Sequence, residues 1–314
     1  MVLENLKNLI SVNSNKYPKE FQKILEAFND EYKINEQDVN LLWSAYKFGD
    51  YAHKGQKRKS GKPYFTHCVE VCIQLIHWHM DIDTLVAGLL HDTIEDTSVK
   101  KTDLEKKFNK DIAHLVAGVS KLSDIKFKDY KHKQAENLMK MFLAVAKDLR
   151  VIIIKFSDRL HNMKTLDSLP KEKQIRISQE TKDLYAPLAH RLGMNELKMD
   201  YENLVLKYVD NNSYENIKKK INTTNKVRNK FIEEFIKPIQ SNLLTFSINA
   251  KVFGRAKHYY SIYRKMNLHS KKFNELYDLF AIRIIVDKIE ECYSVLGIVH
   301  QIYTPMQERF KDYM

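Results

Sequence analysis

Glycine and proline are scarce in this sequence, and this scarcity limits the folds open to the chain more than any other feature. The 314 residues include eight glycines and six prolines, so few positions interrupt a helix or impose a tight turn. Apolar residues recur at helical spacing in Ile82–His91, Lys133–Lys147 and Asp148–Leu166, which is the pattern of amphipathic helices. We therefore predict that long helices dominate the first two thirds of the chain.

The pattern changes from about Leu244 onward. Phe246–Phe253 alternates as a strand does, Tyr259–Met266 has helical spacing, and Ala281–Val286 is a short β-branched run typical of a buried strand. The predicted fold is mainly α, with a helical domain followed by the opening of an α/β domain.

The composition favours a folded cytoplasmic enzyme. Hydrophobic residues make up 44% of the chain, which is enough for buried cores. No apolar run approaches the roughly 18 residues that a membrane helix needs, and the first residues do not form a secretory signal. The three cysteines are an odd number and do not suggest a disulfide framework. We interpret Cys68 and Cys72, four residues apart, as core filling rather than as zinc ligands.

The net charge of +12 raises the question of a nucleic-acid or phosphate partner. Only ten of the 52 basic residues are arginine, whereas proteins that read bases and phosphates tend to use the arginine fork. The excess of lysine is interpreted as a surface coat, and we expect no direct contact with nucleic acid.

Two histidines and two aspartates form a candidate metal site. His91 and Asp92 are adjacent and end an apolar helix; one such pair alone is common by chance. A separate helix opens with His67, and a third carries Asp158. Two imidazoles and two carboxylates from three helices suit a divalent ion such as Mn²⁺ or Fe²⁺.

The segment around Asp158 is consistent with a site on one helical face. Asp158, Asn162 and Thr165 follow the spacing i, i+4 and i+7, so they project from the same side. The flanking apolar residues point elsewhere and supply the buried surface: Phe156, Leu160, Met163 and Leu166.

More acids and a basic loop lie near these residues in sequence. Glu95 and Asp96 follow the His91–Asp92 pair, and so many acids in one pocket would repel one another without a cation. A metal ion lowers the pKa of water, and a carboxylate outside the ligand set can take its proton. Lys54–Pro63 is a polar, basic loop. Its Arg58 can form two parallel hydrogen bonds to phosphate oxygens, and Lys59 and Ser60 follow Arg58 in the sequence. Together, the histidines, the acids and the basic loop predict metal-assisted hydrolysis of a phosphate ester. Without the histidines and acids, the loop would be interpreted as an ordinary solvated loop.

Five stretches resemble the RelA/SpoT homologue family, whose enzymes make and degrade (p)ppGpp. They are GQKRKSGKPYFTH (Gly55–His67), AGLLHDTIEDT (Ala87–Thr97), FSDRLHNMKTL (Phe156–Leu166), FGRAKHYYSIYRKM (Phe253–Met266) and YDLFAIRIIV (Tyr277–Val286). The resemblance covers nearly the whole chain. It implies an all-helical HD-type hydrolase domain in residues 1–195 and a partial α/β synthetase domain, with a mixed nucleotidyltransferase-like sheet, in residues 196–314.

The resemblance also implies an activity and its residues. The activity is hydrolysis of the 3′-pyrophosphate of ppGpp or pppGpp, which yields GDP or GTP and pyrophosphate. The implied site consists of the Mn²⁺ ligands His67, His91, Asp92 and Asp158, the catalytic acids Glu95 and Asp96, and the nucleotide contacts Arg58, Lys59, Ser60, Asn162 and Thr165.

For the synthetase domain, the resemblance implies an ATP-handling motif and an aspartate for Mg²⁺. In bifunctional members of the family, an R-x-K-D signature accompanies a working hydrolase. Directly before this signature, the present chain has Gln307–Glu308 where the family often has Pro-Gly. The residues are Arg255, Lys257 and His258 with Ser261 and Lys265 nearby, Asp278 for Mg²⁺, and Arg309, Phe310, Lys311 and Asp312 for the signature.

The family pattern continues beyond Met314 with a guanine-stacking tyrosine and a second catalytic glutamate. We therefore expect an incomplete synthetase domain that binds ATP weakly and forms no ppGpp. Ribosomal or regulatory partners are expected to need the family's C-terminal half. The sequence leaves open whether the chain is a natural or an engineered fragment.

Two rival functions remain open. One is an HD phosphohydrolase that acts on another nucleotide, such as a deoxynucleoside triphosphate. The other is a catalytically silent nucleotide sensor or RNA-associated module. The Arg58–Ser60 loop together with Glu95 and Asp96 favours ppGpp, and the complete metal set argues against a silent protein.

Other histidines are given structural interpretations. His77 and His79 are expected at the surface or in packing contacts, and His161 is interpreted as structural. His53, just before the basic loop, is expected to support that loop.

Overall fold

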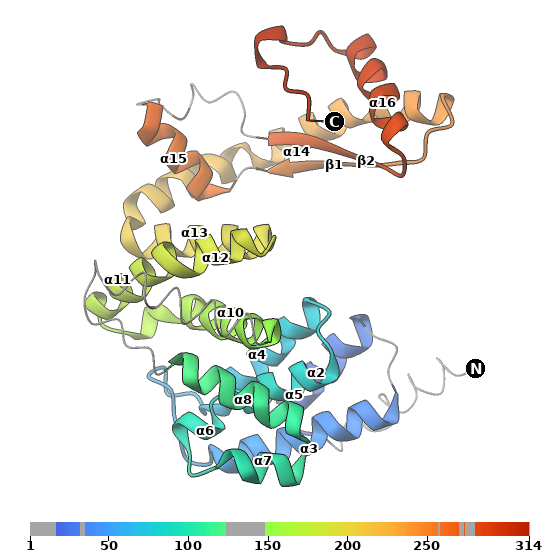
Figure 1. Cartoon of the computed structure of the whole chain (residues 1–314). Coiled ribbons are helices and arrows are strands. Elements are labelled where there is room, and N and C mark those ends of the chain that lie inside the picture. Colours follow the sequence, from blue (N-terminus) through green and yellow to red (C-terminus); the bar gives the residue numbers. More distant parts are fainter. Residues whose placement is uncertain are drawn as a thin grey trace. The chain divides into compact units, whose positions relative to one another are not determined.

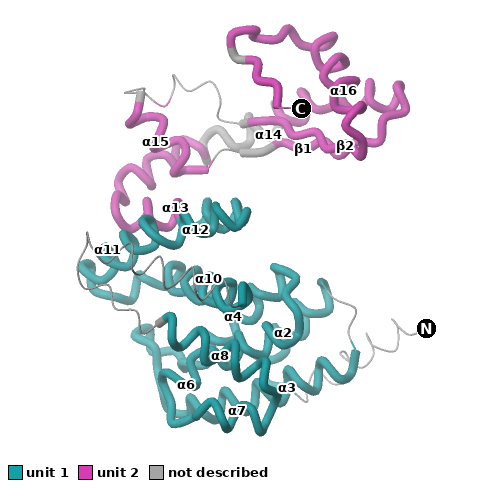
Figure 2. Tube along the Cα trace, in the orientation of Figure 1, with its two compact units in different colours: residues 1–201 teal, residues 202–314 magenta. Residues whose placement is uncertain are grey.

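Helices make up most of the chain in the computed structural model, which describes residues 17–31, 35–123, 148–256, 258–269, 273 and 280–313 (Figure 1). The mainly α fold predicted from the sequence is confirmed. The chain divides into two compact units, residues 1–201 and 202–314 (Figure 2). This division falls within helix α13 (Asn195–Val209), close to the boundary expected after residue 195.

Short and medium-length helices build the first unit. The predicted helical segment Lys133–Lys147 lies outside the described residues. The elements are α2 (Lys19–Glu31), α3 (Glu36–Ala52), α4 (Phe65–His77), α5 (Ile82–Leu90), α6 (Thr93–Asp96), α7 (Lys101–Lys107), α8 (Lys110–Ser123), α10 (Leu149–Lys164), η1 (Leu166–Ser168), α11 (Lys171–Glu180), the π-helix η2 (Thr181–Tyr185) and α12 (Ala186–Arg191).

Aspartate side chains fix the starts of two helices that matter for the site. Asp81 caps α5 by accepting a hydrogen bond from the backbone N–H of Thr84 at 3.0 Å. Asp148 caps α10 by accepting one from the backbone N–H of Arg150 at 2.9 Å. Such caps satisfy N–H groups that a helix start leaves unpaired.

The core of this unit brings α4, α5 and α10 together (Figure 1). All residues of α5 from Thr84 to Leu90 are buried. A side chain at Gly88 would collide with Leu75 of α4, so glycine permits the close approach of these two helices. The buried Ser157 hydroxyl of α10 donates to the carbonyl of Val71 in α4 at 2.9 Å. Three helices distant in sequence are thus held side by side.

The second unit contains the remainder of α13, then α14 (Asn211–Thr245), β1 (Ala250–Ala256), α15 (Tyr259–His269), β2 (Phe280–Val286), α16 (Ile289–Ile302) and η4 (Gln307–Arg309). The two strands pair antiparallel, in register from Ala250 opposite Val286 to Ala256 opposite Phe280. Strand β1 starts later than the expected Phe246 because α14 continues to Thr245 and is followed by a turn with Ser247 at φ 56°.

Strand β2 is amphipathic, and the prediction of a fully buried strand was wrong. Ile282 and Ile284 pack against a cluster that includes Leu243 of α14 and Val295 of α16. Ile285, the residue after Ile284, is 48% exposed. An antiparallel pair covered on one face leaves alternate residues in solvent.

Within the described residues, no helix combines the length and the apolar character needed to cross a bilayer.

Candidate metal centre and its surroundings

Four predicted ligands converge in the first unit. Nε2 of His67 lies 3.2 Å from Oδ1 of Asp158 and 3.7 Å from Oδ2 of Asp92. Nε2 of His91 lies 3.0 Å from Oδ1 of Asp92. Each of the four residues is at most 7% exposed. Potential ligand atoms of His67, His91 and Asp158 all lie within 4.8 Å of one another, so the group can hold one ion.

Helix ends position three of these side chains, and the interior of α10 positions the fourth. His67 lies in the first turn of α4, and Asp158 lies in α10. His91 is the C-cap of α5, and Asp92, the next residue, is the N-cap of the short helix α6. The α5–α6 junction therefore places an imidazole and a carboxylate at one point of the buried interior.

The His91 ring fits a metal ligand. Its Nδ1 lies 2.9 Å from the carbonyl oxygen of Gly88, which can only accept, so the ring keeps a proton there. Burial alone would lower the pKa of this ring, but Asp92 outweighs it and raises this pKa in the metal-free protein, and loss of the Nε2 proton to a bound ion would leave the Nε2 lone pair as the ligand. That buried Nε2 has no hydrogen-bond partner, although Asp92 lies 3.0 Å away. Buried polar atoms are rarely left unpaired. A divalent ion between nitrogen and carboxylate would satisfy both.

The electrostatics also suit a cation. Burial alone would raise the pKa of Asp158, but Lys155 and His67 outweigh it and hold this pKa well below its usual range. Burial lowers the pKa of His67 and keeps its ring neutral, as metal ligation requires. Cys68 also has its sulfur within 4.8 Å of ligand atoms of His91 and Asp92. Because burial raises the pKa of its thiol, we interpret Cys68 as core filling, as its sequence context suggested.

Tyr64 links the metal centre to the predicted catalytic acids, and sequence reasoning missed it. Its hydroxyl lies 2.8 Å from Oδ2 of Asp92 and 2.7 Å from Oδ2 of Asp96. Burial, with Asp92 next in effect, raises its pKa, so the hydroxyl keeps its proton. Asp96 and its neighbour Glu95 are exposed at the end of α6. One sequence signal could have identified Tyr64 as a site residue: it precedes His67 by three residues, which is about one helical turn.

The basic loop reaches the same place. Gly55 and Gly61 have φ of 84° and 83°, a left-handed conformation that favours glycine. Nη2 of Arg58 donates to Oδ1 of Asn162 at 2.7 Å, and Nδ2 of Asn162 in turn donates to Oδ1 of Asp158. A continuous chain of hydrogen bonds therefore runs from the loop to a predicted metal ligand.

The remaining predicted nucleotide contacts lie around this chain. Lys59 and Ser60 are exposed in the loop. The hydroxyl of Thr165 donates to backbone carbonyls of its own helix, at 3.0 Å from His161 and 3.3 Å from Asn162. Thr165 thus shares the side of Asn162 but uses its hydroxyl at the helix end.

Two histidines support the site. His53 Nδ1 lies 2.8 Å from Oε1 of Gln56, and Nε2 of Gln56 donates to the Asp96 carbonyl at 2.7 Å. The expectation that His53 supports the loop is confirmed. His161, interpreted from the sequence as structural, has its Nδ1 2.6 Å from Nδ1 of His67. His161 follows Asp158 by three residues and so lies on the same face of α10. Burial and the nearby His67 and Arg58 lower the pKa of His161 to about 3.

The other sequence interpretations can be checked as well. His77 and His79 lie at the surface, as expected, and ring nitrogens of both approach Glu31 at 3.5 Å. Cys72 is buried in the core beside Cys68.

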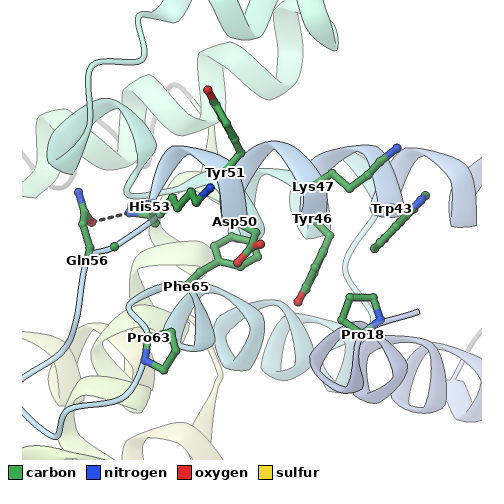
Figure 3. A pocket seen from close by; sticks show the side chains of 12 residues that line it. Pro18, Trp43, Tyr46, Lys47, Asp50, Tyr51, His53, Gln56, Pro63 and Phe65 are labelled. Carbon is green, nitrogen blue, oxygen red and sulfur yellow. Dashed lines mark hydrogen bonds between the residues drawn. The ribbon is translucent and has the colours of Figure 1, made fainter. Parts of the chain in front are cut away.

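A cavity of about 440 Å³ is lined by residues of α3, the start of α4 and the basic loop (Figure 3). Its walls contain aromatic residues such as Trp43, Tyr46 and Phe65, with Asp50 beside them, and His53 and Gln56 near its end. None of the four predicted metal ligands lines it. This hollow is therefore distinct from the candidate metal centre.

The synthetase residues lie in the second unit, only partly within the described set. His258 precedes α15, and Ser261 and Lys265 lie four apart on that helix. Lys311 is exposed near the end of the chain. Arg255 lies in β1 opposite Ala281. The Arg255 and Arg309 side chains, and the whole of Lys257 and Asp278, lie outside the described residues, so no joint site of these residues is described.

Comparison with known proteins gives the chain's relatives. Residues 45–195 match the family described as HD domain, and residues 254–314 match the family described as region found in RelA / SpoT proteins. The bifunctional (p)ppGpp synthase/hydrolase SpoT of Escherichia coli K12 is 44% identical over 281 residues, 90% of this chain and 40% of that protein. A GTP pyrophosphokinase of Myxococcus xanthus is 43% identical over 280 residues, 88% of this chain and 37% of its own.

A third relative, a guanosine-3′,5′-bis(diphosphate) 3′-pyrophosphohydrolase of Spiroplasma citri, is 40% identical over 284 residues, 90% of this chain and 38% of its own. The chain spans about two fifths of the length of these relatives. The identity runs through both matched regions, in the order in which the helical unit and the second unit follow each other here. This chain belongs to the RelA/SpoT family.

Proposed function

We propose that the first unit hydrolyses the 3′-pyrophosphate of (p)ppGpp with a divalent metal ion. The observation that carries this proposal is the buried convergence of His67, His91, Asp92 and Asp158, with His91 Nε2 unpartnered. The printed names of the relatives, which include 3′-pyrophosphohydrolases, supply the substrate class.

His67, His91, Asp92 and Asp158 would hold the ion. When bound, a divalent cation supplies a concentrated positive charge that lowers the pKa of water and polarises phosphate oxygens. Two imidazoles and two carboxylates, with Cys68 kept as a thiol, favour Mn²⁺ over zinc. We propose Mn²⁺ as the ion in this site.

The exposed acids manage the proton of the attacking water. Glu95 and Asp96 stand at the end of α6, where substrate and water can reach them. The Tyr64 hydroxyl holds Asp96 against Asp92, so this carboxylate is fixed beside the ligands. A fixed carboxylate outside the ligand set can orient a water molecule and accept its proton.

The loop neutralises the phosphates of the substrate. Arg58 already lies beside Asn162, and its guanidinium can fork onto two phosphate oxygens. Lys59 adds a point charge and Ser60 a hydroxyl, and both side chains are exposed. Asn162 and Thr165 are proposed to border the ribose or phosphate side of the nucleotide.

The second unit is proposed to belong to the synthetase activity of the family. Arg255, Lys257 and His258, with Ser261 and Lys265, would handle ATP, while Asp278 would hold Mg²⁺ and Lys311 would belong to the R-x-K-D signature. GDP or GTP is the proposed acceptor. The proposed compartment is the cytoplasm.

A direct assay tests the hydrolase. Purified protein with Mn²⁺ should convert ppGpp to GDP and pyrophosphate, and should leave dGTP largely intact. Asp158→Ala, which removes a carboxylate from the cluster, should lose both metal binding and turnover. Preferred hydrolysis of dGTP would support the broader HD phosphohydrolase instead. Metal binding without turnover of either nucleotide would support a silent sensor, and full activity of metal-stripped Asp158→Ala would remove the metal from the mechanism.

A further inference from the structure

We propose that His161 is a positioning residue for the metal site: its Nδ1 accepts the Nδ1 proton of His67 and so turns the lone pair of His67 Nε2 toward the ion. This inference rests on the proposed metal site and assigns a role to a residue outside the ligand set. The proposed metal site would then depend on five side chains, three of which are imidazoles.

The geometry of the two rings requires a proton between them. Their Nδ1 atoms are 2.6 Å apart, and the ring centroids are 4.8 Å apart with a tilt of 39°. Two nitrogen lone pairs at this distance would repel, and two N–H groups would collide. One ring therefore donates and the other accepts.

Metal ligation decides the direction of this hydrogen bond. The other nitrogen of His67, Nε2, faces Oδ1 of Asp158 at 3.2 Å and Oδ2 of Asp92 at 3.7 Å, so Nε2 is the ligand atom. A neutral imidazole that ligates through Nε2 carries its single proton on Nδ1. His67 is then the donor and His161 the acceptor, with the proton of His161 on its own Nε2.

A ligand histidine commonly donates its second N–H to a carboxylate or carbonyl, which fixes the ring and its tautomer. His91 follows this pattern through the Gly88 carbonyl at 2.9 Å. In the part of the chain that the structure describes, the hydrogen-bond partner of His67 Nδ1 is His161. The two ligand imidazoles are thus oriented by different acceptors, one from the backbone and one from a side chain.

His161 is well placed to do this. It follows Asp158 by three residues on α10, so one helix supplies both a ligand and the partner of another ligand. Its backbone carbonyl accepts the Thr165 hydroxyl at 3.0 Å. A displacement of α10 would therefore disturb two of the four ligands together, and this ties metal affinity to the placement of that helix.

Metal titrations of two variants test the role. His161→Leu removes the acceptor, whereas His161→Asn offers Oδ1 at the place of Nδ1. We expect the Kd for Mn²⁺ to rise by about 10- to 100-fold in His161→Leu, and His161→Asn to recover most of that loss. His190→Leu, the same change at an exposed histidine of α12, is the matched control and should bind Mn²⁺ as the unaltered protein does.

The outcomes are distinct. Unchanged Mn²⁺ affinity in His161→Leu overturns the proposal, and an equal loss in His161→Leu and His161→Asn shows a packing role rather than an acceptor role. The titration uses Mn²⁺ without nucleotide, so a protein that binds metal yet does not cleave ppGpp leaves this test intact while the proposed function fails.

A second measurement does not depend on any variant that could fail to fold. In the ¹⁵N-histidine-labelled unaltered protein loaded with diamagnetic Zn²⁺, ring chemical shifts report which nitrogen carries each proton. We expect the proton of His161 on Nε2 and that of His67 on Nδ1. A proton on Nδ1 of His161 would reverse the hydrogen bond and overturn the proposal.

Discussion

Nζ of Lys155 lies 2.7 Å from Oδ2 of Asp158, and both groups are shielded from water. The two residues are one helical turn apart on α10. Burial alone would lower the pKa of Lys155, but Asp158 outweighs it and raises that pKa, so the amine is charged. Lys155 occupies one oxygen of Asp158 and leaves Oδ1 facing His67 at 3.2 Å. In the proposed metal site, Asp158 would therefore offer Oδ1, which also accepts a hydrogen bond from Asn162, as its ligand oxygen.

Replacing Lys155 by methionine should destabilise the metal-free protein, because Asp158 then remains as a buried charge without its strongest partner. We expect a loss of about 3 kcal/mol of unfolding free energy, measured by urea denaturation in EDTA. Saturating Mn²⁺ should restore part of this loss, since the ion supplies a new counter-charge. Lys121→Met on the exposed side of α8 is the control. Equal stability of both variants in EDTA would contradict this role of Lys155.

Combining Glu95→Gln with Asp96→Asn should separate chemistry from binding. Both changes keep the size of the side chain but remove the carboxylate that takes a proton, so kcat should fall by a factor of about 100 or more. The Kd for Mn²⁺ and the KM for ppGpp should change little, because neither acid is among the proposed ligands. Loss of the bound metal in this double variant would instead make the acids ligands or structural supports.

The sequence predicted the ligand cluster and missed the residues that orient it. His67, His91, Asp92 and Asp158 carry a chemical signal, since two imidazoles and two carboxylates suit a divalent metal ion. Tyr64, Lys155 and His161 carry none on their own. Their partners are identified only when α4, α6 and α10 are packed together.

The fold shows the same limit. Helical periodicity predicted α5 and α10 to within two residues, because burial of one face requires that spacing. Residues 281–286 were predicted as a strand but misjudged as buried on both faces. A short β-branched run does not reveal that, in the described part of the chain, only α14 and α16 cover one side of this strand.

The Asp148 cap gives the stability of the first unit a defined dependence on pH. A hydrogen-bonded ion pair with Arg150 lowers the pKa of Asp148. A carboxylate with a lowered folded pKa stabilises the fold above its unfolded pKa of about 3.9, and this contribution is lost as pH falls through the folded pKa.

Asp148→Ala should therefore cost about 1 kcal/mol of unfolding free energy at pH 7, and the difference from the unaltered protein should shrink below about pH 4. Asp148→Asn, which can still cap α10, is expected to lose less. Urea denaturation at a series of pH values provides the measurement. A difference that stays constant down to pH 3 would show that the charge of Asp148 does not contribute.

Arg58→Ala should weaken binding of ppGpp more than it slows the chemical step. Loss of a charge-assisted contact to phosphate should raise KM by about 10-fold or more, with a smaller change in kcat. Arg58→Lys should recover little, because an ammonium group cannot form a fork on two oxygens. Lys57→Ala, at an exposed position of the same loop, is the control. If Arg58→Ala instead weakened Mn²⁺ binding with KM unchanged, the chief role of Arg58 would be to hold Asn162, and through it Asp158, rather than the nucleotide.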